Sequence, residues 1–428
     1  MILITVILII ILMVMGLPLF AGILAVTLIG LHVSGVDFMA IPIEILRLAN
    51  APVLLAVPLF TFAGYLMAEG GTSKRLVRFS RSLFGWIPGG LGIVALVTSA
   101  FFTAITGATG VTIIALGGLL LPALLAEKYE NNFSLGLVTT SGSIGLHFPP
   151  SLPIIFYGFV SGVSIEKLFM AGLLPGAVIV FVLCLYSMYM GSRWRLKRPP
   201  FSSREFFPAL KEAAWELPIP VLIIAGIYSG FSTATEAAAL TVVYVLFVKI
   251  FVFRELNIKN DVPRVMRDSA KMVGSIMIIL GAALGFTNYL VDALIPLKIL
   301  KLMEGMISSK IVFLLVLNVF LIIVGCMMDI FSAILVVVPL IIPLASRFGV
   351  EPLHLGIVFL TNLAIGYNTP PVGLSLFISS SRFNQPVTRI YRATLPFLIL
   401  LLLTLLLITY WPNLSLFLPR LLGKMTLA

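Results

Sequence analysis

Charged residues are scarce in this chain. Asp, Glu, Lys and Arg make up only 11% of its 428 residues, whereas hydrophobic residues make up 60%. A soluble domain carries about a quarter charged residues. The mean hydropathy of +1.15 therefore predicts an all-α polytopic membrane protein with about 10–12 transmembrane segments, at roughly 20 apolar residues per span.

Cysteine and histidine are also scarce, with two and three copies. Cys184 and Cys326 lie within apolar runs, so we expect neither a disulfide framework nor a C-x-x-C metal or redox site. The motifs H-E-x-x-H and G-x-S-x-G are absent, and a single aspartate deep in a span excludes a paired-aspartate protease. We predict that the chain is not an enzyme and uses no organic cofactor or transition metal.

The net charge of +11 does not indicate nucleic-acid binding, because the basic residues form short clusters between apolar runs. Four clusters, within 74–81, 193–211, 254–271 and 382–392, are predicted to lie in the cytoplasm. This topology makes the apolar arms 84–106 and 110–126 a re-entrant hairpin entered from the cytoplasm. The arms 311–326 and 331–346 form a second hairpin entered from outside, and Lys298, Lys301 and Lys310 fall on the outer side.

The first residues of the chain are strongly apolar but lack the basic region of a signal peptide. We expect them to be retained in the membrane. Residues 1–34 are compatible with one span or two.

The two halves of the chain contain a repeat. Residues 144–150 (IGLHFPP) match 365–371 (IGYNTPP) at an offset of 221, and Pro122 matches Pro343 at the same offset. The charge map gives the two copies opposite orientations. Each double proline must break its helix, and such a break is tolerated in a membrane only where protein buries it or it lines a wet cavity.

Inverted repeats with broken helices and hairpin tips near the midplane are typical of secondary transporters. The predicted division is a scaffold at 1–83, a first transport repeat at 84–162, scaffold and linkers at 163–310, a second transport repeat at 311–380, and a C-terminal scaffold helix at 381–428. A channel also uses broken helices, but paired hairpins in inverted halves favour alternating access.

The oxygen-bearing and glycine residues around the tips and breaks are candidates to bind cations, since a half-helix end and unwound carbonyls can hold an ion. The predicted ion-binding residues are Thr106, Gly107, Thr109, Ser141, Ser143, Gly145, Asn362, Gly366, Asn368 and Thr369. The predicted substrate-binding residues are Thr112, His147, Pro149, Pro150, Ser151, Asp329, Ser332, Pro370 and Pro371.

Structural roles remain open for the same residues. Asp329 is expected either to be functional or to cap the second arm of its hairpin. His147 is expected either to take part in proton coupling or to contact the substrate. The alternative is a neutral histidine bonded to a freed carbonyl. Serine and threonine hydroxyls often bond their own helix at i−4, and Glu236 is expected to cap the arm that follows it.

Several separate motifs resemble the large membrane subunit of TRAP transporters. They are Val57 to Arg78, Ser141 to Pro153, Gly226 to Ala239, Met328 to Pro343 and Asn362 to Phe377. The resemblance implies an elevator-type secondary transporter of the ion-transporter superfamily in a bacterial or archaeal cytoplasmic (inner) membrane. It further implies sodium as the coupling ion. The implied partners are a separate small membrane subunit (Q-type) and an extracytoplasmic solute-binding protein (P-type).

The family implies import of a small organic acid, such as a C4-dicarboxylate or a sialic acid. Thr106–Gly107–Ala108 stands where a Ser-Gly-Ser-like tip is usual, and His147, Tyr367 and Asn368 replace aliphatic residues. These departures leave the solute and the number of coupled ions open. A proton-coupled carrier of another small organic anion is the alternative, supported by His147 and Asp329.

Overall fold

The computed structural model describes residues 17–35, 37–196, 200–293 and 309–425. Throughout these ranges the regular secondary structure is helical. Eight of the described helices are long and apolar enough to cross a membrane, or nine if the pair Asn131–His147 and Leu152–Ser161, bent by 44°, is one span. Four shorter apolar helices accompany them. The chain is therefore a multi-pass membrane protein, as its composition predicts.

Two groups of four helices carry the repeat. The first contains α6 (Gly90–Thr106), α7 (Thr109–Ala126), α8 (Asn131–Ile144) and α9 (Leu152–Ser161), with the 3₁₀ turn η2 (Gly145–His147) at the break. The second contains α16 (Lys310–Met327), α17 (Ile330–Arg347), α18 (Pro352–Gly366) and α19 (Leu374–Phe383). Helix α7 begins at 109 and α17 at 330, and 330 − 109 = 221, so the offset found in the sequence is also the structural offset.

The two repeats pack on each other in a reciprocal way. Within each half, the first hairpin arm packs on the first part of the broken helix, as α6 on α8 and α16 on α18. Between the halves, α7 packs on α19 and α17 packs on α9. Each hairpin therefore covers the break of the other half as well as its own.

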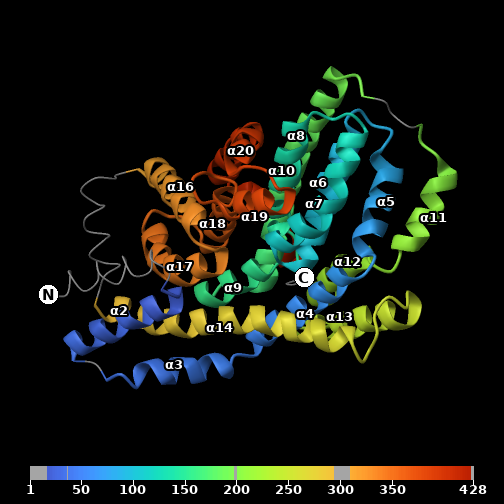
Figure 1. Ribbon diagram of the computed structural model, residues 1–428. Helices are drawn as coiled ribbons and strands as arrows, with labels where there is room; N and C mark the ends of the chain where they lie inside the picture. The colour runs from blue at the N-terminus through green and yellow to red at the C-terminus, as the bar shows by residue number, and fades with distance from the viewer. Residues whose placement is uncertain (1–16, 36, 197–199, 294–308, 426–428) are drawn as a thin grey trace.

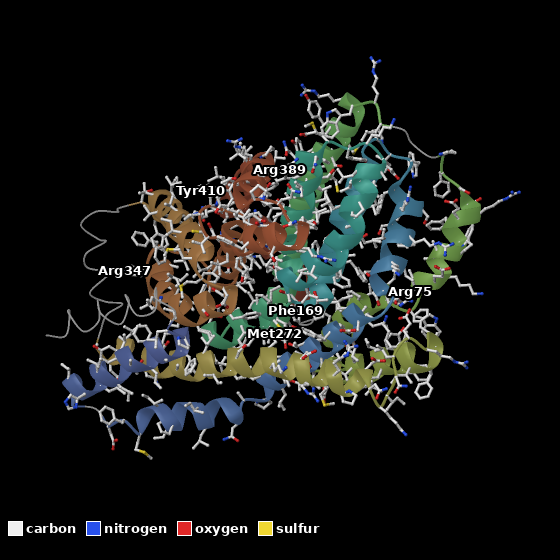
Figure 2. The ribbon with its side chains drawn as sticks, in the orientation of Figure 1. Arg75, Phe169, Met272, Arg347, Arg389 and Tyr410 are labelled. Atoms are coloured by element: carbon white, nitrogen blue, oxygen red, sulfur yellow. The ribbon has the colours of Figure 1, made fainter. Side chains whose placement is uncertain are left out.

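A second layer of helices lies along one side of the repeats, at the bottom of Figure 1. It contains α2 (Leu19–Ser34), α3 (Ala40–Ala49), η1 (Pro52–Leu55), α4 (Ala56–Glu69), α12 (Pro218–Tyr228), α13 (Ala234–Phe247), the π-helical turn η3 (Val248–Val252) and α14 (Asp261–Asp292). Helix α14 packs on α2, α3 and α4, and it meets the second repeat at α17. Tyr65 of α4 donates to Met272 Sδ of α14 at 3.3 Å, inside this layer. Figure 2 labels Met272 on α14.

Two amphipathic helices connect this layer to the repeats. They are α5 (Thr72–Phe84) and α11 (Ser203–Ala213), which pack on each other, and α5 also packs on α6. The remaining helices are α10 (Ile165–Arg193), α20 (Val387–Tyr410) and α21 (Asn413–Met425). Helix α10 packs on α6, α18 and α20, and α20 packs on α8, so both lie against the repeats, although the predicted division puts them with the scaffold.

Glycines allow the closest approaches between the helices. A Cβ on Gly145 would lie 2.3 Å from the Ala100 carbonyl oxygen of α6, and a Cβ on Gly366 would lie 2.5 Å from the Gly325 carbonyl carbon of α16. The two positions are equivalent under the repeat. Small residues at such contacts let helix backbones meet closely in a membrane. The structure thus gives Gly145 and Gly366 a packing role, and their predicted part in ion binding stays untested.

Some boundaries differ from the expected ones. The first hairpin arm starts at Gly90 and not at 84, because Gly85, Pro88 and Gly89 form a turn, with Gly89 at φ 68°. The arms of the second hairpin agree with 311–326 and 331–346 to within a residue. Residues 1–16 of the predicted N-terminal membrane segment 1–34 lie outside the described residues. Lys298 and Lys301 also lie outside them.

Replacing Gly145 or Gly366 by alanine should destabilise the protein by about 1–3 kcal/mol, because each new methyl group meets backbone atoms. Gly274→Ala is the matched control, since a Cβ there meets nothing within 4 Å, and alanine is the better helix former. Thermal unfolding in detergent measures both effects. Equal melting temperatures for the three variants would contradict this role of the two glycines.

Candidate functional site

The two hairpin tips and the two helix breaks come together in one region. The tip of the first hairpin is Gly107, at φ 65°, and a Cβ there would lie 2.6 Å from Leu152 Cδ1 at the start of α9. The tip of the second hairpin reaches the same helix, since the Phe331 ring lies 5.2 Å from the Phe156 ring. Both tips therefore contact α9.

Polar contacts link the two breaks across more than 200 residues of sequence. Asn368 Nδ2 donates to Ser143 Oγ at 2.9 Å, and His147 Nε2 lies 2.8 Å from Thr361 Oγ1. His147 and Asn368 are equivalent under the repeat, because 368 − 147 = 221. In each repeat, the residue at this equivalent position therefore contacts the other repeat.

The peptide bonds Pro149–Pro150 and Pro370–Pro371 are both cis. Phe148 enters the first double proline in an extended conformation, with φ −98° and ψ 135°. Ser151 follows the double proline and is the N-cap residue of α9, but its side chain makes no capping hydrogen bond. The four prolines lie where the sequence predicts the breaks.

Several buried oxygens of the predicted ion-binding set have no protein hydrogen-bond partner. They are Thr106 Oγ1, Thr109 Oγ1, Asn362 Oδ1 and Asn368 Oδ1, and Ser151 Oγ of the predicted substrate set joins them. Buried polar groups are nearly always bonded. The oxygens of Thr106, Thr109 and Asn368, at the tips and breaks, are therefore candidates to coordinate a ligand. Neutral oxygens are the ligands of hard cations, and this donor set fits sodium.

Other predicted residues already have partners. Thr112 Oγ1 lies 2.7 Å from Thr103 Oγ1, and Ser141 Oγ donates to Ser99 Oγ at 3.1 Å. Thr369 Oγ1 donates to the Ile365 carbonyl at 2.9 Å, the i−4 bond common for threonine. The hydroxyl protons of these residues are donated to protein acceptors, whereas the oxygen lone pairs remain available to coordinate a cation.

Asn362 lies on a different side of α18 from the break contacts. Its Nδ2 donates to Asn318 Oδ1 of α16 at 2.8 Å, and Asn318 in turn donates to Thr409 Oγ1 of α20 at 3.1 Å. His354, near the start of α18, is buried and lies within hydrogen-bond distance of Ser415 and of the Thr409 carbonyl. This polar chain joins the second hairpin to the C-terminal helices.

Asp329 caps the second hairpin. Its Oδ1 accepts from the amides of Phe331 and Ser332 at 3.0 Å each, and the Ser332 hydroxyl also bonds its carboxylate. The Tyr367 hydroxyl accepts from the amide of Ile330 at 2.6 Å. The first amides of α17 are thus all satisfied, whereas α7 and α9 begin without a side-chain cap. Glu236 likewise completes a capping box with Thr233.

Sequence reasoning missed some polar residues of this region. Thr140, Ser375 and Ser379 are buried and their hydroxyls have no hydrogen-bond partner. Thr361 Oγ1 lies within hydrogen-bond distance of His147 Nε2. The repeat gave a signal for one pair, because Thr140 and Thr361 are equivalent at the offset of 221. Ser375 and Ser379 face inward from α19, and nothing in the apolar pattern of 374–383 distinguishes their face.

The first hairpin also touches the second layer. A Cβ on Gly64 of α4 would lie 2.7 Å from Thr106 Cα. The candidate site is therefore at the boundary between the repeats and the layer formed by α4 and α14. Within the described ranges, no group of three or more His, Cys, Asp or Glu side chains is placed to hold a metal.

Tyr367→Phe should destabilise the protein by about 1–3 kcal/mol, because it leaves the buried Ile330 amide without its acceptor. Tyr410→Phe is the control: Tyr410 donates to the Ile311 carbonyl but is 39% exposed, so its loss should stay within about 0.5 kcal/mol. Thermal unfolding and hydrogen exchange at Ile330 measure the difference. Unchanged exchange at Ile330 would rule out the tyrosine as its partner.

The family model described as the DctM component of the tripartite ATP-independent periplasmic transporter matches residues 2–414. The C4-dicarboxylate TRAP transporter large permease protein DctM of Pseudomonas aeruginosa is 35% identical over 385 residues, which cover 90% of both chains. The sialic acid TRAP transporter large permease SiaM of Vibrio cholerae is 33% identical, with 86% of both chains covered.

Two further relatives extend the comparison. The isethionate TRAP transporter permease DctMQ of Oleidesulfovibrio alaskensis is 35% identical over 95% of this chain, which spans 64% of that longer protein. The crystal structure of the YdaH transporter of Alcanivorax borkumensis matches with a TM-score of 0.63 at 14% identity, over 88% of both chains, and shares the fold. The chain belongs to the DctM family of TRAP transporter large permeases, and it is a transporter component and not an enzyme.

Proposed function

We propose that this permease imports a small organic acid by sodium-coupled alternating access, with the two repeats moving as one body past the layer of α2, α3, α4, α13 and α14. One observation carries the proposal: Thr106, Thr109 and Asn368, each at a hairpin tip or a helix break, have buried side-chain oxygens without a hydrogen-bond partner. Helices α10 and α20 pack on the repeats and move with them in this mechanism.

Sodium is bound by the neutral oxygens of Thr106, Thr109, Asn368 and the carbonyls freed at the breaks. Its charge adds to the positive ends of α7 and α9, whose first amides have no side-chain cap. These helix starts then attract the anionic group of the solute. Binding of cation and anion is coupled because each lowers the electrostatic cost of the other.

Proton coupling has less support. His147 Nε2 donates to Thr361 Oγ1, because the Thr361 hydroxyl already donates to the Ile357 carbonyl at 2.7 Å. Asp329 is engaged in capping α17. Both groups on which a proton pathway depends thus serve local structure.

The partners follow from the family. We propose a small membrane subunit and an extracytoplasmic solute-binding protein, with the complex in the cytoplasmic membrane of the cell. The solutes named for the relatives differ, with C4-dicarboxylate, sialic acid and isethionate among them. The residues in which this chain departs from the usual pattern, His147, Tyr367 and Asn368, lie at the breaks, where they affect the shape of the solute site.

Sodium chloride should raise the melting temperature of the purified protein relative to choline chloride at the same ionic strength, because a ligand of the folded state stabilises it by RT ln(1 + [L]/Kd). Asn368→Ala should reduce this sodium-specific rise, whereas Thr27→Ala should not. Thr27 is buried in α2 and bonds only the Ile23 carbonyl in the described structure. A rise that potassium reproduces, or that Asn368→Ala leaves intact, would argue against the sodium site.

Cysteines placed at Thr106 and Ser332 should change their accessibility in opposite senses when the carrier switches face. The two tips enter from opposite sides of the membrane, so water reaches one when it leaves the other. A cysteine at Ser275 on α14 is the control, since it is exposed and lies in the fixed layer. Thiol labelling in membrane vesicles, after replacement of Cys184 and Cys326, tests this; equal labelling in both states at both tips would exclude the movement.

A further inference from the structure

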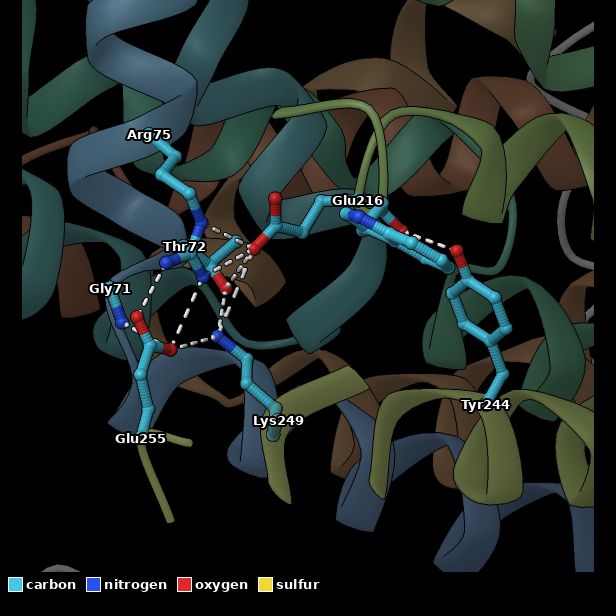
Figure 3. Close-up of polar contacts among 8 residues, drawn as sticks. Gly71, Thr72, Arg75, Glu216, Tyr244, Lys249 and Glu255 are labelled. Atoms are coloured by element: carbon cyan, nitrogen blue, oxygen red, sulfur yellow. Dashed lines mark hydrogen bonds and ion pairs between the residues drawn. The ribbon is translucent and has the colours of Figure 1, made fainter. Parts of the chain in front are cut away.

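A largely buried set of ion pairs joins four segments at one corner of the molecule (Figure 3). Arg75 lies in the first turn of α5, Glu216 between α11 and α12, Lys249 in η3, and Glu255 in the turn before α14. Arg75 Nε donates to Glu216 Oε1 at 2.8 Å, and Arg75 Nη2 donates to Glu255 Oε2 at 3.2 Å. Lys249 Nζ donates to Glu255 Oε2 at 3.0 Å. We name these four residues the corner network.

The surroundings are shaped around these charges. Lys249 and Glu216 are each only 1% exposed. Lys249 Nζ also donates to Thr72 Oγ1 at 2.6 Å, and a Cβ on Gly70 would lie 2.4 Å from that nitrogen. The Arg75 guanidinium lies 3.7 Å above the Phe253 ring. Gly70 thus lies directly beside Lys249, and both cations are largely enclosed by protein.

The corner network is neutral as a set, with two cations and two carboxylates. Burial raises the pKa of Glu255, but hydrogen bonds from Arg75 and Lys249 outweigh it and hold that pKa at about 2. Glu255 is therefore ionised at any physiological pH. Separating the four residues would leave lone charges out of water, which is strongly unfavourable.

The contact of α5 with the repeats differs in chemistry from its contact with the corner network. On the repeat side, Arg81 pairs with Glu127 at the end of α7, and their side chains are 54% and 29% exposed. Exposed pairs contribute little to stability. On this side α5 also packs on α6, and the buried Thr98 hydroxyl of α6 donates to Ser80 Oγ at 3.0 Å. Among the described contacts, α5 thus meets the repeats without a buried charge, and the buried charges lie at its other end.

Helix α11 packs on α5 and leads directly into the corner network. Arg78 of α5 pairs with Glu212 of α11 at 2.5 Å, and Glu216 follows α11 directly. The two helices form one unit, which we name the strut (α5 and α11). Figure 2 shows Arg75 where the strut meets the layer of α12 and α13.

The link from the strut to the first repeat is short. Gly89 already belongs to the repeat side, because Ser187 Oγ of α10 donates to its carbonyl at 3.0 Å and a Cβ on Gly89 would lie 2.1 Å from the Ser187 carbonyl oxygen. The chain between the end of α5 and Gly89 is residues 85–88. These residues join two well-packed bodies.

We infer that the corner network is the fixed anchor of the strut, which keeps α5 and α11 on the layer of α4, α13 and α14 while the repeats move and the chain bends at 85–88. The inference rests on the alternating access proposed above. Arg75, Glu216, Lys249 and Glu255 are positioning residues: they lie away from the tips and breaks and act only by holding the strut.

Spin labels at Lys74 on α5 and Lys271 on α14 test the anchor by pulsed dipolar distance measurement, on the full chain in lipid nanodiscs with Cys184 and Cys326 replaced. The wild-type protein should give one narrow distance in both sodium and choline chloride. The double variant Lys249→Met with Glu255→Gln leaves Arg75 paired with Glu216 and no lone charge. It should broaden the distribution roughly twofold, since a neutral replacement keeps the fold but removes the ionic tie.

The control is Arg78→Gln with Glu212→Gln, which removes an exposed pair from the same two helices and should leave the distance narrow. If the first double variant does not fold, Arg75→Met with Glu216→Gln removes the other half of the network. Narrow distributions in the folded network variants, or two distances in the wild-type protein, would overturn the anchor. The measurement needs neither solute nor transport. Its result can therefore be interpreted even if the chain does not carry out sodium-coupled import.

Discussion

Backbone groups freed inside a membrane must find partners within the protein, and this constraint governs the structure. Two double prolines interrupt helices in the apolar interior, one after α8 and one after α18. The chain covers each break with the hairpin of its own half and with that of the other half, through the packing of α7 on α19 and of α17 on α9. Neither repeat could bury its break alone, so the fold and the candidate site have one physical origin.

The reciprocal cover has a consequence for rigidity. His147 reaches Thr361, Asn368 reaches Ser143, and Tyr367 reaches the amide of Ile330. Each contact crosses from one hairpin or break to another, and the first two cross between halves. The movement proposed above requires a group of helices tied together in this way. The group meets the neighbouring layer at Gly64 of α4, where a Cβ would lie 2.7 Å from Thr106 Cα, and through the packing of α14 on α17.

The few charges of the chain are divided between two uses. Exposed pairs such as Arg81 with Glu127 lie where segments meet at the surface and contribute little. The corner network is largely enclosed, and its residues come from parts of the sequence as far apart as 75 and 255. In a membrane protein with 11% charged residues, two of these four charges, Lys249 and Glu216, are buried and the other two are partly covered. Separating the four residues would therefore be costly.

The sequence by itself determined the class, the repeat, both hairpins and both breaks. The signals for these features are local: glycine and proline interrupt helices wherever they occur, and the offset of 221 transfers one half onto the other. Helix α17 spans Ile330–Arg347, close to the predicted arm 331–346, for this reason. The oxygen-rich residues at the breaks were also evident, since they stand out from apolar surroundings.

Only the tertiary structure decided which of those oxygens have partners. Ser141 bonds Ser99 and Thr112 meets Thr103, whereas Thr106 and Asn368 keep free oxygens. It also decided that Asp329 caps α17 and that α10 and α20 lie against the repeats. Helices that are apolar all round carry no periodic signal for the face that meets a neighbour. Their rotation, and with it the partner of every polar side chain, is set by close packing between segments far apart in the chain.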